Sequence, residues 1–491
     1  MNDELQAAID AYIDANWENV IADIRTLVQV PSVEDLDAAA PNAPYGPGPR
    51  KALDGALSIA ERMGLDAHDC DGYVGYADLH GERATQIGII GHVDVVPAGP
   101  GWSFEPYDVT KKDGFLLGRG VADDKGPLAT ALHAVNFWHD RGVRLPYTIR
   151  VLFGANEETN MKDIAFYRAH YADPAFLFTP DAEFPVCYGE AGICSGVLAS
   201  APLGGRGACG EVALSSGTGS FEVCGAIEAI EGGVAVNAVP GTAWARVRGD
   251  ALMDSAQDLA ISSTGISLSV EGESVIVNAR GKSAHASTPE LGRNAIDLLC
   301  AYLLRSVRLA DDERAFLQLV RTVTSSYDGS GLGVQAHDEH FGDLTCVGGT
   351  IRFEEGRMLL TIDFRYPTTT AAKQIEQRVQ ACAASCGATF EMQHDKEPFL
   401  MDPDSPAVQA LLLAYNQATG EDAKPFTMKG GTYARVFSTG VSFGPEKPWE
   451  TKPDWVGSMH GPDEGIREDL LKQAFAIYVR TIARLMELNL E

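Results

Sequence analysis

Basic residues are scarce in this chain. Lys and Arg number 39 against 68 Asp and Glu among 491 residues, so the formal net charge is −29. A nucleic-acid partner needs clustered Lys and Arg to neutralise phosphates, and the charge balance therefore predicts no nucleic-acid partner. An acidic balance is typical of a well-solvated surface, and a minor part of it can be carboxylates that hold cations.

Long apolar runs and a cysteine framework are also absent. No stretch approaches the roughly 18 apolar residues that cross a bilayer, and no basic segment followed by an apolar run opens the chain, so we expect neither a membrane span nor a signal peptide. The nine cysteines are scattered, which favours reduced thiols in a reducing, cytoplasmic compartment. Cys382 and Cys386 lie one helical turn apart, but with no second pair nearby a zinc finger is not indicated.

The length and the pattern of elements predict two domains, because 491 residues exceed what one simple core accommodates. Helices and strands alternate in residues 1–186, as in an α/β layered domain. The density of Gly and Pro predicts a loop at 38–50. The expected helices are 2–29, about 50–63 and 127–138, and the expected strands are 86–90, 148–153 and 175–178.

The character changes in residues 187–394, which read as an α+β insert. Short alternating strands at 275–279 and 359–365 accompany two helices near 293–308 and 370–386. We find no function for the Gly/Ser-rich segment 204–220. The α/β pattern returns in 395–491, with a helix at 405–418, a loop at 430–433, a strand at 440–443 and a terminal helix at 466–488.

Polar residues follow several of the predicted strands. The set comprises His92 with Asp94, Glu157 with Glu158, Asp181, His460, and Asp123 directly before a helix. Sites in open α/β sheets form at the carboxyl ends of strands, so these side chains can converge. With Asp94 orienting His92 and one of the two adjacent glutamates spare, two His and three carboxylates remain as ligands. They suit zinc first, with manganese or cobalt as alternatives. Five ligands exceed the needs of one catalytic zinc but fit two metals that share a bridging carboxylate.

Each residue alone also has a structural explanation. Asp123 and Asp124 could cap a helix, Glu157 and Glu158 could be solvated surface residues, and Asp181 could be a turn residue. The functional interpretation gains weight because these residues follow hydrophobic strands or open a helix, in an order that a single sheet can assemble.

The motifs resemble those of the M20 family of metallopeptidases, and within it the bacterial dipeptidases of the PepV type. The matching segments are 43–53 (APYGPGPRKAL), 91–97 (GHVDVVP), 118–127 (GRGVADDKGP), 156–159 (NEET), 180–185 (PDAEFP), 281–287 (GKSAHAS), 363–367 (DFRYP), 430–435 (GGTYAR) and 459–464 (MHGPDE). The resemblance implies a zinc-peptidase-like α/β catalytic domain, with a central mixed sheet flanked by helices, formed by 1–186 and 395–491. An α+β lid domain, 187–394, is inserted into it.

The resemblance also implies a metal-ligand set. Asp123 would bridge two divalent ions, most simply Zn²⁺. His92 and Asp181 would complete one site, and Glu158 and His460 the other.

Catalytic roles follow from the same resemblance. Glu157 would be the general base that activates a metal-bridging water, Asp94 would steady His92, and His285 would reach the substrate carbonyl oxygen. Substrate contacts are expected from Asn237, Arg365 and Gly431, with the Arg365 fork suited to a free carboxylate. Without the resemblance, Arg365 would be interpreted as a strand arginine in a surface ion pair.

The expected function is hydrolysis of unmodified dipeptides by a monomer, with a homodimer as the alternative. An N-acyl-amino-acid deacylase or desuccinylase of the same family would share the metal centre and differ in its amino-end pocket. A non-catalytic metal-binding or peptide-binding protein on this fold would be expected to lack Glu157 or a ligand, and all are present.

Overall fold

The chain forms two compact units. The computed structural model describes residues 3–203, 210–213, 220–223 and 226–490, so most of segment 204–220 lies outside the described residues. Unit 1 comprises Met1–Gly189, Leu400–Thr427 and Gly431–Glu491, and unit 2 comprises Glu190–Phe399 and Met428–Gly430. The assignment of 428–430 to unit 2 differs from the predicted division, because Met428 and Lys429 offer their carbonyls to Ala191 and Arg365.

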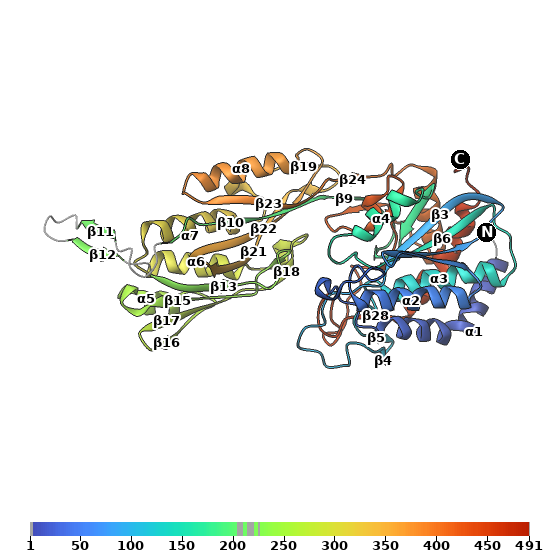
Figure 1. Cartoon of the computed structure of the whole chain (residues 1–491), viewed down its shortest axis with the longest axis horizontal. Coiled ribbons are helices and arrows are strands. Elements are labelled where there is room, and N and C mark those ends of the chain that lie inside the picture. Colours follow the sequence, from blue (N-terminus) through green and yellow to red (C-terminus); the bar gives the residue numbers. More distant parts are fainter. Residues whose placement is uncertain (1–2, 204–209, 214–219, 224–225, 491) are drawn as a thin grey trace. The chain divides into compact units, whose positions relative to one another are not determined.

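Unit 1 is built on a nine-stranded mixed sheet (Figure 1). Its order is β1 (Asp66–Cys70), β2 (Val74–Leu79), β6 (Tyr147–Gly154), β3 (Arg83–His92), β7 (Phe176–Thr179), β26 (Gly440–Ser442), β9 (Cys187–Glu190) and β24 (Phe399–Leu400), with β25 (Phe426–Met428) also on β9. Strands β6, β3, β7 and β26 run parallel, whereas β2 joins β6 and β9 joins β26 antiparallel. This arrangement confirms the predicted α/β fold with a central mixed sheet.

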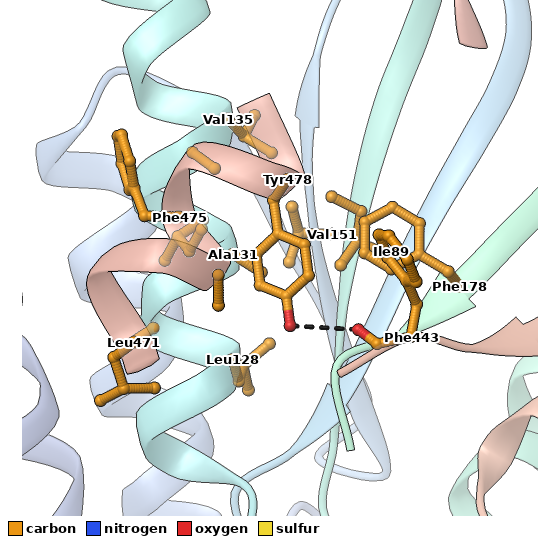
Figure 2. Packing of buried hydrophobic residues seen from close by; sticks show 14 of the residues in the cluster. Ile89, Leu128, Ala131, Val135, Val151, Phe178, Phe443, Leu471, Phe475 and Tyr478 are labelled. Carbon is orange, nitrogen blue, oxygen red and sulfur yellow. Dashed lines mark hydrogen bonds between the residues drawn. The ribbon is translucent and has the colours of Figure 1, made fainter. Parts of the chain in front are cut away.

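In the described part of unit 1, this sheet is accompanied by the helices α1 (Asp3–Val28), α2 (Pro47–Arg62), α3 (Lys125–Asp140), α4 (Lys162–His170), α9 (Pro406–Thr419) and α10 (Glu468–Leu485). Leu128, Ala131 and Val135 recur along one face of α3 and pack with α10 against the sheet, as Figure 2 shows. Tyr478 of α10 donates its hydroxyl to the Phe443 carbonyl at 3.1 Å within this core.

The start of α2 corrects the sequence-based expectation. The helix begins at Pro47, inside the segment predicted to be loop. Proline is accepted in the first helical turn, where a missing N–H removes no intrahelical bond and the fixed φ suits the helix. The prolines of segment 38–50 therefore belong partly to a loop and partly to the first turn of α2.

Unit 2 has an eight-stranded antiparallel sheet in the order β16 (Ile266–Glu271), β17 (Ser274–Arg280), β15 (Thr242–Arg248), β13 (Ile227–Gly232), β21 (Thr345–Glu354), β22 (Arg357–Tyr366), β10 (Gly192–Ala199) and β23 (Thr389–Lys396). It carries α5 (Ala256–Ser262), α6 (Ala295–Ser306), α7 (Asp311–Thr324) and α8 (Ala372–Ala384). The expectation of two helices was wrong, since α5 and α7 were missed. The apolar spacing of Phe316, Val320 and Val323 marks α7.

Short strands complete the two units. They are β4 (Thr110–Lys112), β5 (Phe115–Leu117) and β28 (Gly465–Arg467) in one small sheet, and the pairs β8 (Ala182–Glu183) with β27 (Pro445–Glu446), β11 (Gly210–Ala213) with β12 (Ser220–Val223), β14 (Ala238–Val239) with β18 (Ala284–His285), and β19 (His337–Asp338) with β20 (Gly342–Asp343). None of the helices in the described part of the chain combines the length and apolar character needed to traverse a bilayer.

Candidate active site

The carboxyl ends of three adjacent parallel strands in unit 1 carry the predicted polar side chains. His92 is the last residue of β3, Glu157 and Glu158 follow β6, and Asp181 follows β7. Asp123 precedes α3, and His460 lies in the loop before β28. The strand order therefore brings segments distant in sequence to one edge of the sheet.

These side chains form two three-residue groups that share Asp123. The ligand atoms of His92, Asp123 and Asp181 lie within 4.8 Å of one another, and so do those of Asp123, Glu158 and His460. His92 Nε2 is 2.9 Å from Asp123 Oδ1, whereas His460 Nε2 is 3.0 Å from Asp123 Oδ2. Each oxygen of one carboxylate thus faces a different histidine, which is the arrangement a bridging ligand requires.

The electrostatics of this cluster fit bound cations. Burial raises the pKa of Asp181 well above its ordinary value, and the neighbouring Asp123 and Asp124 raise it further. Burial also raises the pKa of Glu158, again with a contribution from Asp123. Buried carboxylates are normally paired with cations or bound to metal ions. Together with two imidazole nitrogens, this donor set suits zinc-type divalent metals.

Asp94 organises the turn that carries both glutamates. Its backbone carbonyl lies 3.0 Å from His92 Nδ1, and its carboxylate oxygen Oδ1 is farther away, at 3.4 Å. The two carboxylate oxygens instead accept hydrogen bonds from the main-chain amides of Glu157 and Glu158, at 3.2 and 3.1 Å. Asp94 therefore contacts His92 mainly through its carbonyl and uses its side chain to hold the Glu157–Glu158 turn.

Glu157 has the environment of a proton acceptor. Burial raises its pKa well above the ordinary value; the nearby His92 opposes this shift, and Glu158 and Asp123 add to it. A carboxylate with a raised pKa accepts a proton more readily near neutral pH than an exposed one.

Asp124 does not cap the following helix through its side chain. It is completely buried, and its Oδ2 accepts a hydrogen bond from the His92 amide at 3.1 Å, while no side-chain cap bond to α3 forms. The peptide bond between Asp123 and Asp124 is cis. Asp124 therefore occupies the N-cap position of α3, as the helix-cap explanation expects, but its carboxyl group contacts the end of β3 and not the helix.

Two residues missed in the sequence hold the Asp123 loop. Glu464 is fully buried and pairs with Arg119, and its Oε1 accepts hydrogen bonds from the amides of Gly120, Ala122 and Asp123 at 3.0–3.3 Å. Both residues stand inside recognised motifs, 118–127 and 459–464. Their charge and position in those motifs were the available signal.

In unit 2, the short strand pair β14–β18 places His285 beside Asn237. Ala238 pairs with His285, and the Ala286 amide donates to the Asn237 carbonyl at 2.9 Å. The Ser287 amide donates to His285 Nδ1 at 3.2 Å. Because Nδ1 accepts this bond, the neutral ring carries its proton on Nε2 and can donate from there.

Arg365 also lies in unit 2, on β22, and is 5% exposed. Its Nε and Nη2 donate to the two carboxylate oxygens of Asp363 at 2.8 and 3.2 Å, and Nη1 donates to the Lys429 carbonyl at 3.0 Å. Arg365 thus forms an ion pair, but a buried one and not the surface ion pair of the alternative explanation. The two bonds to Asp363 and the one to Lys429 together use three of the five guanidinium N–H groups.

Gly431 lies in unit 1, two residues before the short helix Tyr433–Val436. Thr432 Oγ1 caps that helix by accepting a hydrogen bond from the Ala434 amide at 3.1 Å. The Tyr433 hydroxyl donates to Asp163, so the segment after Gly431 is fixed from inside the unit.

Comparisons with known proteins agree with this geometry. The model of "Peptidase family M20/M25/M40" matches residues 88–484. The Beta-Ala-Xaa dipeptidase of Lactobacillus delbrueckii subsp. lactis is 31% identical over 480 residues, which is 96% of this chain and 97% of that protein. Two solved structures share the fold. The dipeptidase Dug1p from Saccharomyces cerevisiae matches with a TM-score of 0.61 at 12% identity, over 99% of this chain and 100% of that chain. Human carnosine dipeptidase 1 matches with a TM-score of 0.59 at 15% identity, again over 99% of this chain and 100% of that chain. These matches confirm the resemblance read from the motifs, and the chain belongs to peptidase family M20/M25/M40.

Proposed function

We propose that this chain is a dipeptidase that uses two divalent cations to hydrolyse the peptide bond of unmodified dipeptides. The observation that carries the proposal is the Asp123 carboxylate, whose two oxygens face two different histidines beside Glu157. The Beta-Ala-Xaa dipeptidase relative supports small peptides as substrates. Zinc is the proposed metal, and manganese and cobalt are the alternatives to be tested.

The proposed ligands divide into two sets around one bridge. Asp123 would be shared, His92 and Asp181 would complete one site, and Glu158 and His460 the other. Bound divalent ions supply Lewis acidity, which lowers the pKa of water and polarises a carbonyl group. Asp94 would keep Glu157 and Glu158 in place through their amides.

Glu157 is the proposed general base and acid. Its carboxylate would take a proton from the attacking water and deliver it to the nitrogen of the leaving amine, so that the new carboxylate and amine separate. The raised pKa of Glu157 favours both transfers near neutral pH.

Four residues are proposed to bind the substrate. His285 would donate from Nε2 to the carbonyl oxygen as negative charge develops there, consistent with its tautomer. Asn237 and Gly431 would position the peptide. Two guanidinium N–H groups of Arg365 remain beyond its three described bonds, enough for the two oxygens of a terminal carboxylate.

The scattered cysteines support a cytoplasmic location. No disulfide links the cysteines in the part of the chain that the structure describes. A monomer is the proposed state, and a homodimer would be revealed by light scattering.

A panel of free dipeptides, including β-alanyl dipeptides, tests the activity with zinc, manganese or cobalt added. We expect turnover that disappears in Glu157→Gln while the metal content is retained. Turnover that survives this substitution would contradict the assigned mechanism. N-acetylated and N-succinylated amino acids run in parallel, and preferential hydrolysis of these would favour the deacylase alternative.

A further inference from the structure

Asp163 is a completely buried carboxylate that no motif assignment included. It lies in the first turn of α4, and its Oδ1 accepts a hydrogen bond from the Ile164 amide at 2.7 Å. Its Oδ2 accepts bonds from the amides of Ala155 and Asn156, at 2.8 and 3.0 Å, and from the Tyr433 hydroxyl. Asp163 thus connects its own helix with two separate loops.

The first loop is the turn that presents Glu157. Asp163 accepts from the amides of Ala155 and Asn156, and Asp94 accepts from those of Glu157 and Glu158. Four consecutive main-chain N–H groups are therefore held by two buried carboxylates. Asp163 holds the backbone directly before Glu157, and Asp94 holds the backbone of Glu157 and Glu158.

The second loop carries Gly431. Tyr433 is completely buried and packs so closely on Gly154 that a Cβ there would lie 2.1 Å from the Tyr433 hydroxyl oxygen. Glycine at 154, the last residue of β6, is what permits this approach. A buried hydrogen bond from Tyr433 to Asp163 then links the Gly431 loop to the end of β6.

We propose that Asp163 is a positioning residue for the proposed peptidase reaction, setting the place of Glu157 through the Ala155 and Asn156 amides. Tyr433 extends the same anchor to the Gly431 loop. This inference rests on the proposed function. All four partners of Asp163 are donors, and Oδ2 alone accepts the three bonds from the two loops. Asparagine has one acceptor oxygen and no negative charge, and its NH₂ group would face the remaining donor, the Ile164 amide.

Steady-state kinetics of three variants on a hydrolysed dipeptide test the proposal. Asp163→Asn should lower kcat about ten- to a hundredfold at full metal content, because small displacements of a catalytic group are costly. Tyr433→Phe keeps the Ala155 and Asn156 bonds, so it should mainly raise KM, by roughly fivefold. The matched control is Tyr167→Phe, which removes another buried hydroxyl of the same hydrophobic cluster, one that accepts from Arg150 at 3.0 Å, and should change neither constant.

Unchanged kcat and KM in both Asp163→Asn and Tyr433→Phe, with only the loss of stability seen in Tyr167→Phe, would overturn the proposal. If Asp163→Asn does not fold, the kinetics of Tyr433→Phe alone test the proposal, because this variant lacks only one hydroxyl group and keeps the buried ring.

Amide hydrogen exchange separates this inference from the proposed function, because it needs no activity. If wild type hydrolyses no dipeptide, the proposed function fails. Faster exchange across 155–158 in Asp163→Asn, and across 430–434 in Tyr433→Phe, would still support the anchor. Wild-type exchange rates in these segments would contradict it.

Discussion

Arg119 and Glu464 form a buried ion pair that ties the loop before α3 to the loop carrying His460. Their side chains are 1% and 0% exposed. One oxygen of Glu464 also accepts hydrogen bonds from the amides of Gly120, Ala122 and Asp123. The backbone at Asp123 is therefore held by a residue that lies four positions after His460. The loop that carries Asp123 and the loop that carries His460 are therefore held together by this ion pair and these hydrogen bonds.

Glu464→Gln should weaken metal binding without removing a ligand. The substitution leaves Arg119 buried without its counter-charge, which typically costs about 3–5 kcal/mol of unfolding free energy, and loosens the Asp123 loop. We expect at least a tenfold lower metal affinity, measured by competition with a chromogenic chelator, together with a lower urea midpoint.

Glu313→Gln is the control for this change. Glu313 is a buried glutamate of unit 2 that likewise accepts main-chain amides, from Ala226, Ile227 and Ala310 at 2.9–3.0 Å. It should lower stability while metal affinity stays at the wild-type value. An equal loss of affinity in both variants would show that global destabilisation, and not the Asp123 loop, is responsible.

Asp123 and Asp124 should respond differently to substitution although they are adjacent. Asp123→Ala removes the carboxylate that both three-residue groups share, and we expect both metals to be lost. Asp124→Asn keeps an acceptor for the His92 amide and should leave at least one metal bound. Metal analysis of each protein after gel filtration measures the outcome, and retention of both ions by Asp123→Ala would refute the bridging role.

The strand-end side chains could be predicted because one short segment of sequence shows both the end of a strand and the polar side chain that follows it. An apolar strand that stops at a polar residue is visible without a structure, as at His92 and Asp181, and parallel strand ends share one edge of a sheet. Asp163 and Glu464 left no such trace. Most of their partners are main-chain amides, which nearly every residue carries, so only the folded backbone shows which carboxylate these amides meet.

The ion-pair partner of Arg365 could have been predicted from the sequence. Asp363 lies two residues earlier on the same strand, and residues i and i+2 of a strand share a face. An Asp and an Arg at this spacing predict the ion pair that the structure contains. The ion pair was considered as an alternative to the substrate role, but Asp363 was not identified as its partner.

His285 should contribute through Nε2 and not through its contact with Ser287. His285→Ala is expected to lower kcat about a hundred- to a thousandfold, the usual effect of removing one oxyanion donor, with metal content unchanged. Ser287→Ala deletes only the hydroxyl 2.7 Å from Nδ1 and keeps the amide that donates to the same nitrogen, so its effect should stay within about fivefold. Equal losses in the two variants, measured with one dipeptide, would indicate that the loop conformation matters and not the imidazole.

The ionisation of Asp163 should give the unfolding free energy a specific pH dependence. Burial raises its pKa to about 6, opposed by the hydrogen bond from Tyr433 and assisted by the nearby Asp94. An unfolded aspartate titrates near 3.9, so between pH 4 and 6 the native state keeps a proton that the unfolded state has lost. The stabilising contribution of this group is therefore complete below pH 4 and is lost as the pH rises through 6.

Asp163→Asn cannot ionise and removes this dependence. Relative to that variant, the wild-type protein should lose about 3 kcal/mol of unfolding free energy between pH 4 and 7, since each pH unit of separation between the two pKa values corresponds to 1.4 kcal/mol. Urea unfolding at several pH values measures the difference, in which contributions common to both proteins, including metal release, cancel. Tyr167→Phe, which retains the carboxyl group, should follow the wild-type curve. A difference between wild type and Asp163→Asn that stays constant with pH would mean that Asp163 titrates as an ordinary carboxyl group.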